Sequence, residues 1–129
     1  MIADDNVFFR ETLHFVLSVM NTVTLLKEAK NGEEAIAFAA ELSPDIIIMD
    51  INMSPVNGFE ATRKILKHNP HIKIIGVSMH REPSYCKNMM RLGAKGYLTK
   101  SVSHSEIVIA IKEIAAGRKY IEVDLRDIL

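Results

Sequence analysis

The stretch Asp45-Ile46-Ile47-Ile48-Met49-Asp50 decides the fold. Its apolar residues follow one another directly, without the polar alternation of a strand that faces water on one side. A short, unbroken apolar run of this kind is typical of a central parallel strand that is buried on both faces. We therefore expect a strand here, with helices packed on both sides of it.

The same order of elements repeats on both sides of this strand. Apolar runs at 1–3, 23–29, 73–78 and 96–99 predict four more strands. Each of the five strands leads into a segment with the apolar spacing of a helix. Strict alternation of strands and helices predicts an open parallel sheet with helices on both faces and right-handed connections.

Short polar residues and glycines mark where the expected helices begin and end. Asn6 is placed to cap the first helix, since its side chain can accept a bond from the free amides of the first turn. Ser103 and Glu106 match a capping box at the start of the last helix. Gly93 and Gly117 are placed to end the fourth and fifth helices.

Composition and charge exclude several classes of protein. The 129 residues are 48% hydrophobic and 25% charged, and 16 basic residues balance 16 acidic ones. A net charge of zero argues against binding nucleic acid or a membrane surface by bulk charge. The single cysteine, Cys86, excludes an internal disulfide framework and is typical of a reducing compartment such as the cytoplasm. No apolar run approaches the roughly 20 residues that a membrane span needs.

Polar side chains follow the expected strands at the points where the strands end. Asp4 and Asp5 come after the first strand, and Asp50 ends the third. Ser78 ends the fourth strand, and Lys100 follows the fifth. Because the carboxyl ends of parallel strands share one edge, where such sheets bind ligands, we expect these five residues to lie together.

This set of residues favours phosphoryl chemistry. Three neighbouring carboxylates repel one another, and Mg²⁺, which prefers oxygen ligands, would relieve that repulsion. Lys100 supplies a point charge suited to phosphate, and Asp50 is the best-placed nucleophile for forming an aspartyl phosphate. Taken singly, Asp4 or Asp5 is better explained as a helix cap and Lys100 as a surface lysine; their coincidence at one edge favours the phosphoryl site.

Four motifs at these positions resemble the receiver domain of two-component response regulators. They are Asp4-Asp5, the stretch from Asp50 to Gly58, Val77-Ser78-Met79-His80, and the stretch from Lys95 to Lys100. The resemblance runs from Ile2 to about Gly117. It implies a flavodoxin-like (βα)5 fold, which is a doubly wound five-stranded parallel sheet with the strand order 2-1-3-4-5.

The resemblance also implies a role for each site residue. It makes Asp50 the phospho-acceptor for a sensor histidine kinase, and it gives Mg²⁺ the ligands Asp4, Asp5, Asp50 and the backbone carbonyl of Asn52. Ser78, Lys100 and Tyr97 would bind the phosphoryl group and switch with it, and Asn52 and His80 would tune dephosphorylation. Such a domain is a signalling switch that assists its own Mg²⁺-dependent phosphorylation and dephosphorylation, not an enzyme acting on a metabolite.

Within this family the sequence of these motifs is similar to that of the NarL/LuxR-type subfamily, whose members usually carry a C-terminal DNA-binding domain. We expect residues 1–117 to form the receiver domain, and 118–129 to be a tail or the start of a linker to an absent output domain. A stand-alone receiver and a piece of a longer regulator remain open, and we favour the second. Any contact with DNA would then be made by the output domain.

Two prolines of the family pattern are missing here. Ser54 stands where the family usually has proline, and Pro55 follows one place later. Ser101 follows Lys100 where the family often has proline. A cis bond without proline costs about 3 kcal/mol, which leaves the isomer of the Lys100–Ser101 bond open.

Two helices carry more apolar surface than one buried face requires. Phe8, Phe15 and Val19 form a second stripe on the first helix, and Val108 and Ile109 widen that of the last. The excess slightly favours a homodimer, and the alternative is burial of the two helices against each other.

Two other functions fit the fold class less well. An Mg²⁺-dependent phosphatase with an aspartate nucleophile needs a second carboxylate as general acid, and Asn52 stands at the expected place. A flavodoxin-like nucleotide binder needs a glycine-rich loop after the first strand. The sequence there is Asp4-Asp5-Asn6-Val7, which is acidic and has no glycine.

Overall fold

A parallel sheet of six strands forms the centre of the protein in the computed structural model, which describes residues 1–127. The spatial order is β2-β1-β3-β4-β5-β6, and every neighbouring pair is parallel. The strands are β1 (Ile2–Ala3), β2 (Glu28–Ala29), β3 (Ile46–Asp50), β4 (Lys73–Ser78), β5 (Gly96–Thr99) and β6 (Tyr120–Ile121).

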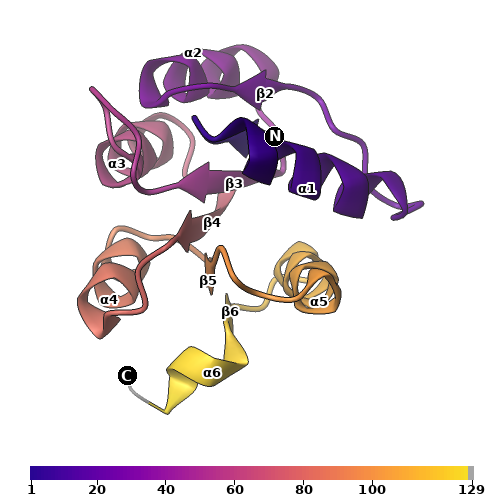
Figure 1. Ribbon diagram of the computed structural model, residues 1–129. Helices are drawn as coiled ribbons and strands as arrows, with labels where there is room; N and C mark the ends of the chain where they lie inside the picture. Colours follow the sequence, from indigo (N-terminus) through magenta and orange to yellow (C-terminus); the bar gives the residue numbers. More distant parts are fainter. Residues whose placement is uncertain (128–129) are drawn as a thin grey trace.

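Helices cover both faces of the sheet (Figure 1). Two of them, α1 and α5, lie on one face, and α2, α3 and α4 lie on the other. A short α6 follows the last strand. The helices are α1 (Val7–Ser18), α2 (Gly32–Leu42), α3 (Gly58–His68), α4 (Pro83–Arg91), α5 (His104–Ala115) and α6 (Val123–Arg126).

Strand β3 is buried on both faces, as its apolar run predicts. Ile47 and Met49 point into the core under α2, α3 and α4, and Ile48 points into the core under α1 and α5. A strand between two cores needs apolar side chains at every position, which explains the missing alternation. The strand ends with Asp50 at the carboxyl edge of the sheet.

The predicted order 2-1-3-4-5 runs through the sheet, but the expected count of five strands is one too low. The sixth strand, β6, lies in the segment after Gly117, and Tyr120 of β6 is in register with Gly96 of β5. A strand of two residues has no periodicity that a sequence pattern could reveal. The boundary at Gly117 between a domain and a linker stays a prediction.

The second strand is much shorter than the predicted 23–29, since only Glu28 and Ala29 pair with β1. Val23 and Leu25 are half-buried against the core beneath α1 and α5 without joining the sheet. Alternating apolar residues can therefore pack from a loop as well as from a strand, and their pattern alone does not distinguish the two.

The expected helix ends are largely confirmed. The Asn6 side chain accepts bonds from the amides of Phe8 and Phe9, and Gly93 and Gly117 have positive φ angles of 109° and 90°. Ser103 accepts a bond from the amide of Glu106, as a capping box requires.

The second half of the capping box is absent. The Glu106 carboxylate bonds to the Tyr120 hydroxyl and the Val123 amide, not to Ser103. The competing partners lie in the C-terminal segment, which the local motif could not reveal.

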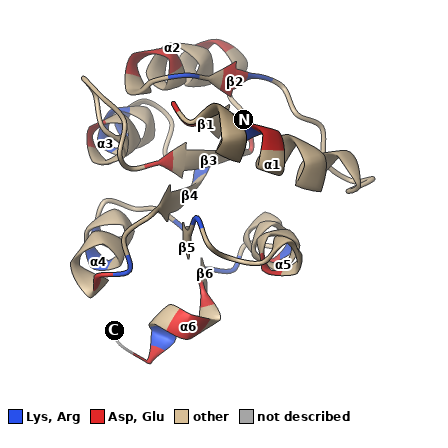
Figure 2. Ribbon diagram, viewed as in Figure 1, with Lys and Arg blue, Asp and Glu red and all other residues tan. Residues whose placement is uncertain are grey.

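Acidic and basic residues are interspersed over the helices (Figure 2), in keeping with the balanced charge. Within residues 1–127, none of the helices has the length and apolar character needed to cross a membrane.

Candidate functional site

Three carboxylates meet at the carboxyl edge of the sheet. Asp4 and Asp5 follow β1 and Asp50 ends β3, and each offers an oxygen within 4.8 Å of those of the other two. Asp4 and Asp50 are each only 1% exposed, whereas Asp5 is exposed. The three residues meet because β1 and β3 are parallel neighbours, with Ala3 in register with Met49. The predicted acidic cluster is therefore present.

Lys100 supplies the positive charge for this cluster. Its Nζ lies 3.0 Å from Asp4 Oδ2 and 3.4 Å from Asp50 Oδ2. The same ammonium lies 5.1 Å from the centre of the Phe9 ring, within the range of a cation–π contact. The main chain of Lys100 is anchored next to β4, because its amide donates to the carbonyl of Ser78 over 2.9 Å. The lysine thus lies between the two buried carboxylates.

Burial raises the pKa of Asp50 to about 7. Repulsion from Asp4 contributes to this rise, and Lys100 and the amide of Asn52 oppose it, so that about 7 is the net result. That amide donates to Asp50 Oδ1 over 3.1 Å. Because a nucleophilic carboxylate must be ionised, a further cation beside Asp50 would favour its reactive form.

The cluster has the chemistry of a site for a hard divalent cation. Asp4 Oδ2 is buried and accepts no hydrogen bond, so the Lys100 ammonium is its counter-charge. Carboxylate oxygens are the protein ligands that Mg²⁺ prefers, and two or three of them are sufficient. The residues present therefore fit this ion.

Ser78 lies beside the cluster in a defined hydrogen-bond network. Its hydroxyl donates to Asn52 Oδ1 over 2.9 Å and accepts from the amide of His80 over 3.0 Å. Ser78 is completely buried at the end of β4, next to Thr99 in the register of β5. The hydroxyl is thus held by residues of two neighbouring loops.

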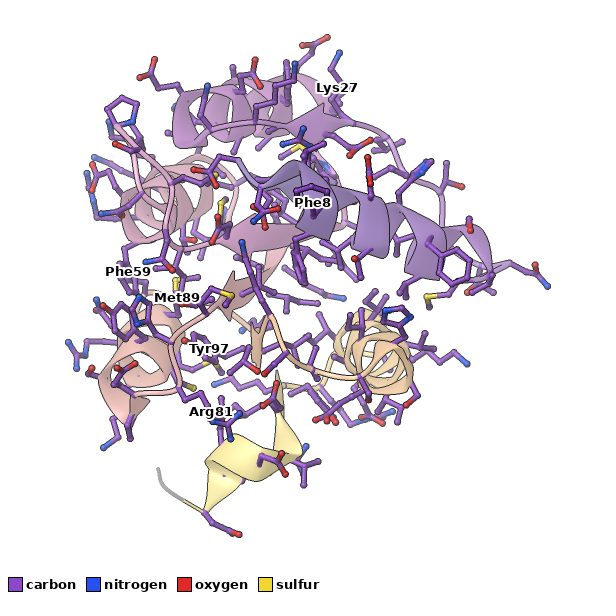
Figure 3. All side chains as sticks on the ribbon, in the orientation of Figure 1. Phe8, Lys27, Phe59, Arg81, Met89 and Tyr97 are labelled. Carbon is purple, nitrogen blue, oxygen red and sulfur yellow. The ribbon has the colours of Figure 1, made fainter. Side chains whose placement is uncertain are left out.

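Tyr97 contacts the same loop from β5. It is completely buried, and its hydroxyl donates to the carbonyl of His80 over 2.9 Å. Burial raises its pKa to about 12, so the phenol stays protonated. Tyr97 and Met89 lie between the sheet and α4 (Figure 3). Ser78 and Tyr97 therefore hold the backbone of His80 at its amide and its carbonyl.

The two residues predicted to tune dephosphorylation lie on this network. The Asn52 side chain is bonded to Ser78, and the His80 ring stacks on Tyr85 with centroids 4.5 Å apart and planes 7° apart. Their effect on dephosphorylation stays a prediction.

The loop after Asp50 contains a cis peptide bond at Ser54–Pro55, the only one in residues 1–127. The Lys100–Ser101 bond, whose isomer the sequence left open, is therefore trans.

Three residues near the site were missed by sequence reasoning. Glu122 is a buried carboxylate that accepts bonds from Thr99 and lies 3.4 Å from Arg81 Nη1. These residues come from three separate segments, and only Thr99 lies in one of the quoted motifs, the stretch from Lys95 to Lys100. One sequence signal could have pointed to Thr99: it ends a strand directly before the site residue Lys100.

These features define the class of the protein: a doubly wound α/β domain with an acidic, lysine-containing site at the carboxyl edge of its sheet. The chain belongs to the response regulator receiver domain family, whose family model matches residues 1–112. Its similarities place it with the NarL/LuxR-type receivers of two-component systems. Receiver domains of this kind act as signalling switches.

The curated relatives are longer than this chain. It is 36% identical to the transcriptional regulatory protein DegU of Brevibacillus brevis over 94% of its own length and 51% of that protein. It is 35% identical to the response regulator GacA of Pseudomonas viridiflava over 94% of its length and 56% of that protein. The chain therefore spans about half the length of these relatives.

A solved structure of a LuxR-family two-component response regulator from Aurantimonas sp. SI85-9A1 has the same fold. The TM-score is 0.94 at 31% sequence identity, over 98% of this chain and 91% of that one. The receiver domain of the response regulator NarL from Mycobacterium tuberculosis gives a TM-score of 0.86 at 28% identity, over 91% and 94% of the two chains.

Proposed function

We propose that this chain accepts a phosphoryl group on Asp50 from a sensor histidine kinase and acts as a phosphorylation-dependent switch in the cytoplasm. One observation carries the proposal: the Asp50 carboxylate is buried at the end of the central strand, beside two further carboxylates and the ammonium of Lys100. Membership of the receiver family supports it. The output is transcription, through a DNA-binding domain outside this chain.

In this proposal Asp4, Asp5, Asp50 and the backbone carbonyl of Asn52 would hold Mg²⁺. The bound ion supplies positive charge that offsets the carboxylates and the incoming phosphoryl oxygens. The buried Asp4 Oδ2, which accepts no hydrogen bond, supports this ligand set.

The transfer itself needs little from the protein beyond position and charge. An oxygen of Asp50 forms a bond to phosphorus, and the bond from phosphorus to the imidazole nitrogen of the donor breaks, leaving the electron pair on that nitrogen. Lys100, 3.4 Å from Asp50 Oδ2, is close enough to neutralise a phosphoryl oxygen. It also lowers the pKa of Asp50 and so favours the carboxylate that attacks.

The switch follows from the hydrogen bonds of Ser78. To donate to a phosphoryl oxygen, its hydroxyl leaves Asn52 Oδ1 and gives up the amide of His80. Tyr97, which holds the carbonyl of the same residue, then moves with the loop. The phosphoryl group biases a two-state equilibrium in this way. Asn52 and His80 set the access of water during self-catalysed dephosphorylation.

Intact mass after incubation with acetyl phosphate and Mg²⁺ tests the proposal. We expect one labile phosphoryl adduct, absent from Asp50→Ala and absent in EDTA. An adduct that persists in Asp50→Ala would show that another residue is the acceptor. No adduct in the unaltered chain, with Mg²⁺ still bound, would contradict the proposed activity.

We also propose that the switch forms a homodimer through α1 and α5. Four of the five residues in the two extra stripes are exposed, and Val108 alone is half-buried in the core. Burial of these stripes within one molecule is therefore not found for Phe8, Phe15, Val19 and Ile109. The rings of Phe15 and His104 lie 6.1 Å apart, so the exposed surface continues from one helix to the other.

A further inference from the structure

A buried carboxylate lies where the C-terminal segment meets the sheet. Glu122, between β6 and α6, is 3% exposed. One of its oxygens accepts bonds from the amide of Thr99 over 3.0 Å and from its hydroxyl over 2.8 Å. The other lies 3.4 Å from Nη1 of Arg81, which is itself half-exposed. Glu122 therefore joins three segments that are distant in the sequence.

Residues 118–127, which we call the C-terminal segment, pair with β5 and pack next to α4. The amide of Tyr120 donates to the carbonyl of Lys95, and the amide of Glu122 donates to the carbonyl of Tyr97. Leu125 is 1% exposed and belongs to the same core cluster as Tyr97. The segment thus lies directly on the strand that carries Tyr97 and leads to Lys100.

The Arg81 end of this contact leads to the phosphoryl site. Arg81 follows His80, whose amide bonds to the Ser78 hydroxyl and whose carbonyl accepts from the Tyr97 hydroxyl. Arg81 projects between α4 and α6 (Figure 3). Displacement of the His80 backbone therefore moves the only cation paired with Glu122 in residues 1–127.

We propose that Glu122 couples the state of the phosphoryl site to the docking of the C-terminal segment; this rests on the function proposed above. When Ser78 turns to the phosphoryl group, the amide of His80 is released and Arg81 is drawn away from Glu122. The carboxylate then keeps only neutral donors from Thr99. A buried charge without its counter-ion is strongly unfavourable, so the segment leaves β5 more readily. The output signal in this mechanism is the release of residues 118–127.

Amide hydrogen exchange measured peptide by peptide tests this coupling. The probe is beryllofluoride with Mg²⁺, a stable stand-in for the phosphoryl group. In the unaltered chain we expect exchange in 118–127 to rise about tenfold with the probe. In Arg81→Gln the segment should exchange faster without the probe, and the probe should add less than about twofold. Arg91→Gln, an exposed arginine at the end of α4, is the matched control and should behave as the unaltered chain.

Glu122→Gln isolates the charge, since the amide oxygen can still accept the bonds from Thr99. Because no buried charge is left to be unpaired, we expect exchange in 118–127 of this variant to stay near that of the unaltered chain without the probe and to rise less than about twofold with it. Arg81→Gln added to Glu122→Gln should then cause no increase. If Arg81→Gln raised exchange in 118–127 equally with and without Glu122→Gln, the proposed pairing of Arg81 with Glu122 would be overturned. Unchanged exchange in 118–127, with altered exchange around Ser78 and Tyr97, would overturn the coupling alone. No change around Ser78 and Tyr97 would overturn the proposed function, and the coupling with it.

Discussion

At the scale of single residues, Asp50 is a compromise between reactivity and stability. Its burial and the neighbouring Asp4 raise its pKa to about 7, although an ionised carboxylate is what the proposed chemistry uses. Between its ordinary pKa of 3.8 and 7, the folded state holds a proton that the unfolded state has lost. The free energy of unfolding therefore falls as the pH rises through this window, and it stays low above it.

We predict that Asp50→Asn removes this pH dependence. In metal-free buffer the variant should match the unaltered chain near pH 4, and above about pH 7 it should be more stable by at least about 1 kcal/mol. Urea unfolding in EDTA at several pH values measures the difference. Glu11→Gln, at an exposed carboxylate of α1, is the control and should show no such gain. Equal stability of Asp50→Asn and the unaltered chain at pH 8 would contradict the raised pKa.

Replacement of Lys100 should have two opposite effects. In Lys100→Met the positive charge beside Asp4 and Asp50 is gone, so Mg²⁺ should bind about tenfold more tightly. The rate of phosphorylation by acetyl phosphate should fall at least about tenfold, because a phosphoryl oxygen loses its cation. Calorimetric titration and intact mass measure the two quantities.

Lys95→Met, at an exposed lysine just before β5, is the matched control and should change neither quantity. A parallel loss of Mg²⁺ affinity and phosphorylation rate in Lys100→Met would mean that the substitution distorts the site instead.

The site could be predicted from the sequence to the extent that it follows from strand ends. Asp4, Asp50, Ser78 and Lys100 come together because parallel strands bring their carboxyl ends to one edge. Glu122 could not be predicted, because its partners depend on the path of a segment that pairs through a two-residue strand.

At the scale of elements, α3 is packed directly against the backbone of the proposed acceptor. Gly58 begins α3, and its amide donates to the carbonyl of Ile51 over 2.8 Å. A Cβ atom at this position would overlap the carbonyl oxygen of Asp50 and the Cα of Ile51. The backbone cannot yield without moving the end of β3, so glycine is required here for close approach.

Gly58→Ala should therefore affect stability and the site together. We expect a loss of about 2 kcal/mol in the free energy of unfolding and slower phosphorylation of Asp50. Urea unfolding and intact mass provide the measurements. Lys67→Ala, at an exposed position of the same helix, should change stability by less than about 0.5 kcal/mol. A stable, fully active Gly58→Ala would show that the end of β3 adapts.

The sequence predicts an element well where a strand is buried on both faces or where a helix is capped by a residue next to it in the sequence. The sequence pattern located β3 and the cap of α1 correctly, since both depend on neighbouring residues. It predicted β2 to be longer than it is, because half-buried side chains before Glu28 pack from a loop, and it missed β6. Edge strands of two residues depend on pairing with distant chain, which periodicity does not report.

At the scale of the whole molecule, the exposed stripes of α1 and α5 predict self-association. Phe15→Asp should weaken the dimer of the beryllofluoride-bound chain at least about tenfold, because it places a charge in the apolar contact. The side chain is 60% exposed in the monomer, so the melting temperature should barely change. Sedimentation equilibrium measures the association.

Leu26→Asp provides the control for general surface polarity. Leu26 is 50% exposed, and it lies in the loop before β2 and belongs to neither stripe. Its replacement should leave the association unchanged. Equal weakening by both variants, or none by Phe15→Asp, would show that the dimer uses another face.

The ion pair between Lys100 and Asp4 joins residues 96 positions apart. Synthesis begins at the N-terminus, so a growing chain exposes its three aspartates long before their lysine is made. A product that stops before β5 keeps the acidic residues but lacks the cation that balances them. Only a chain that has been synthesised past Lys100 can thus assemble the acidic site together with its counter-ion.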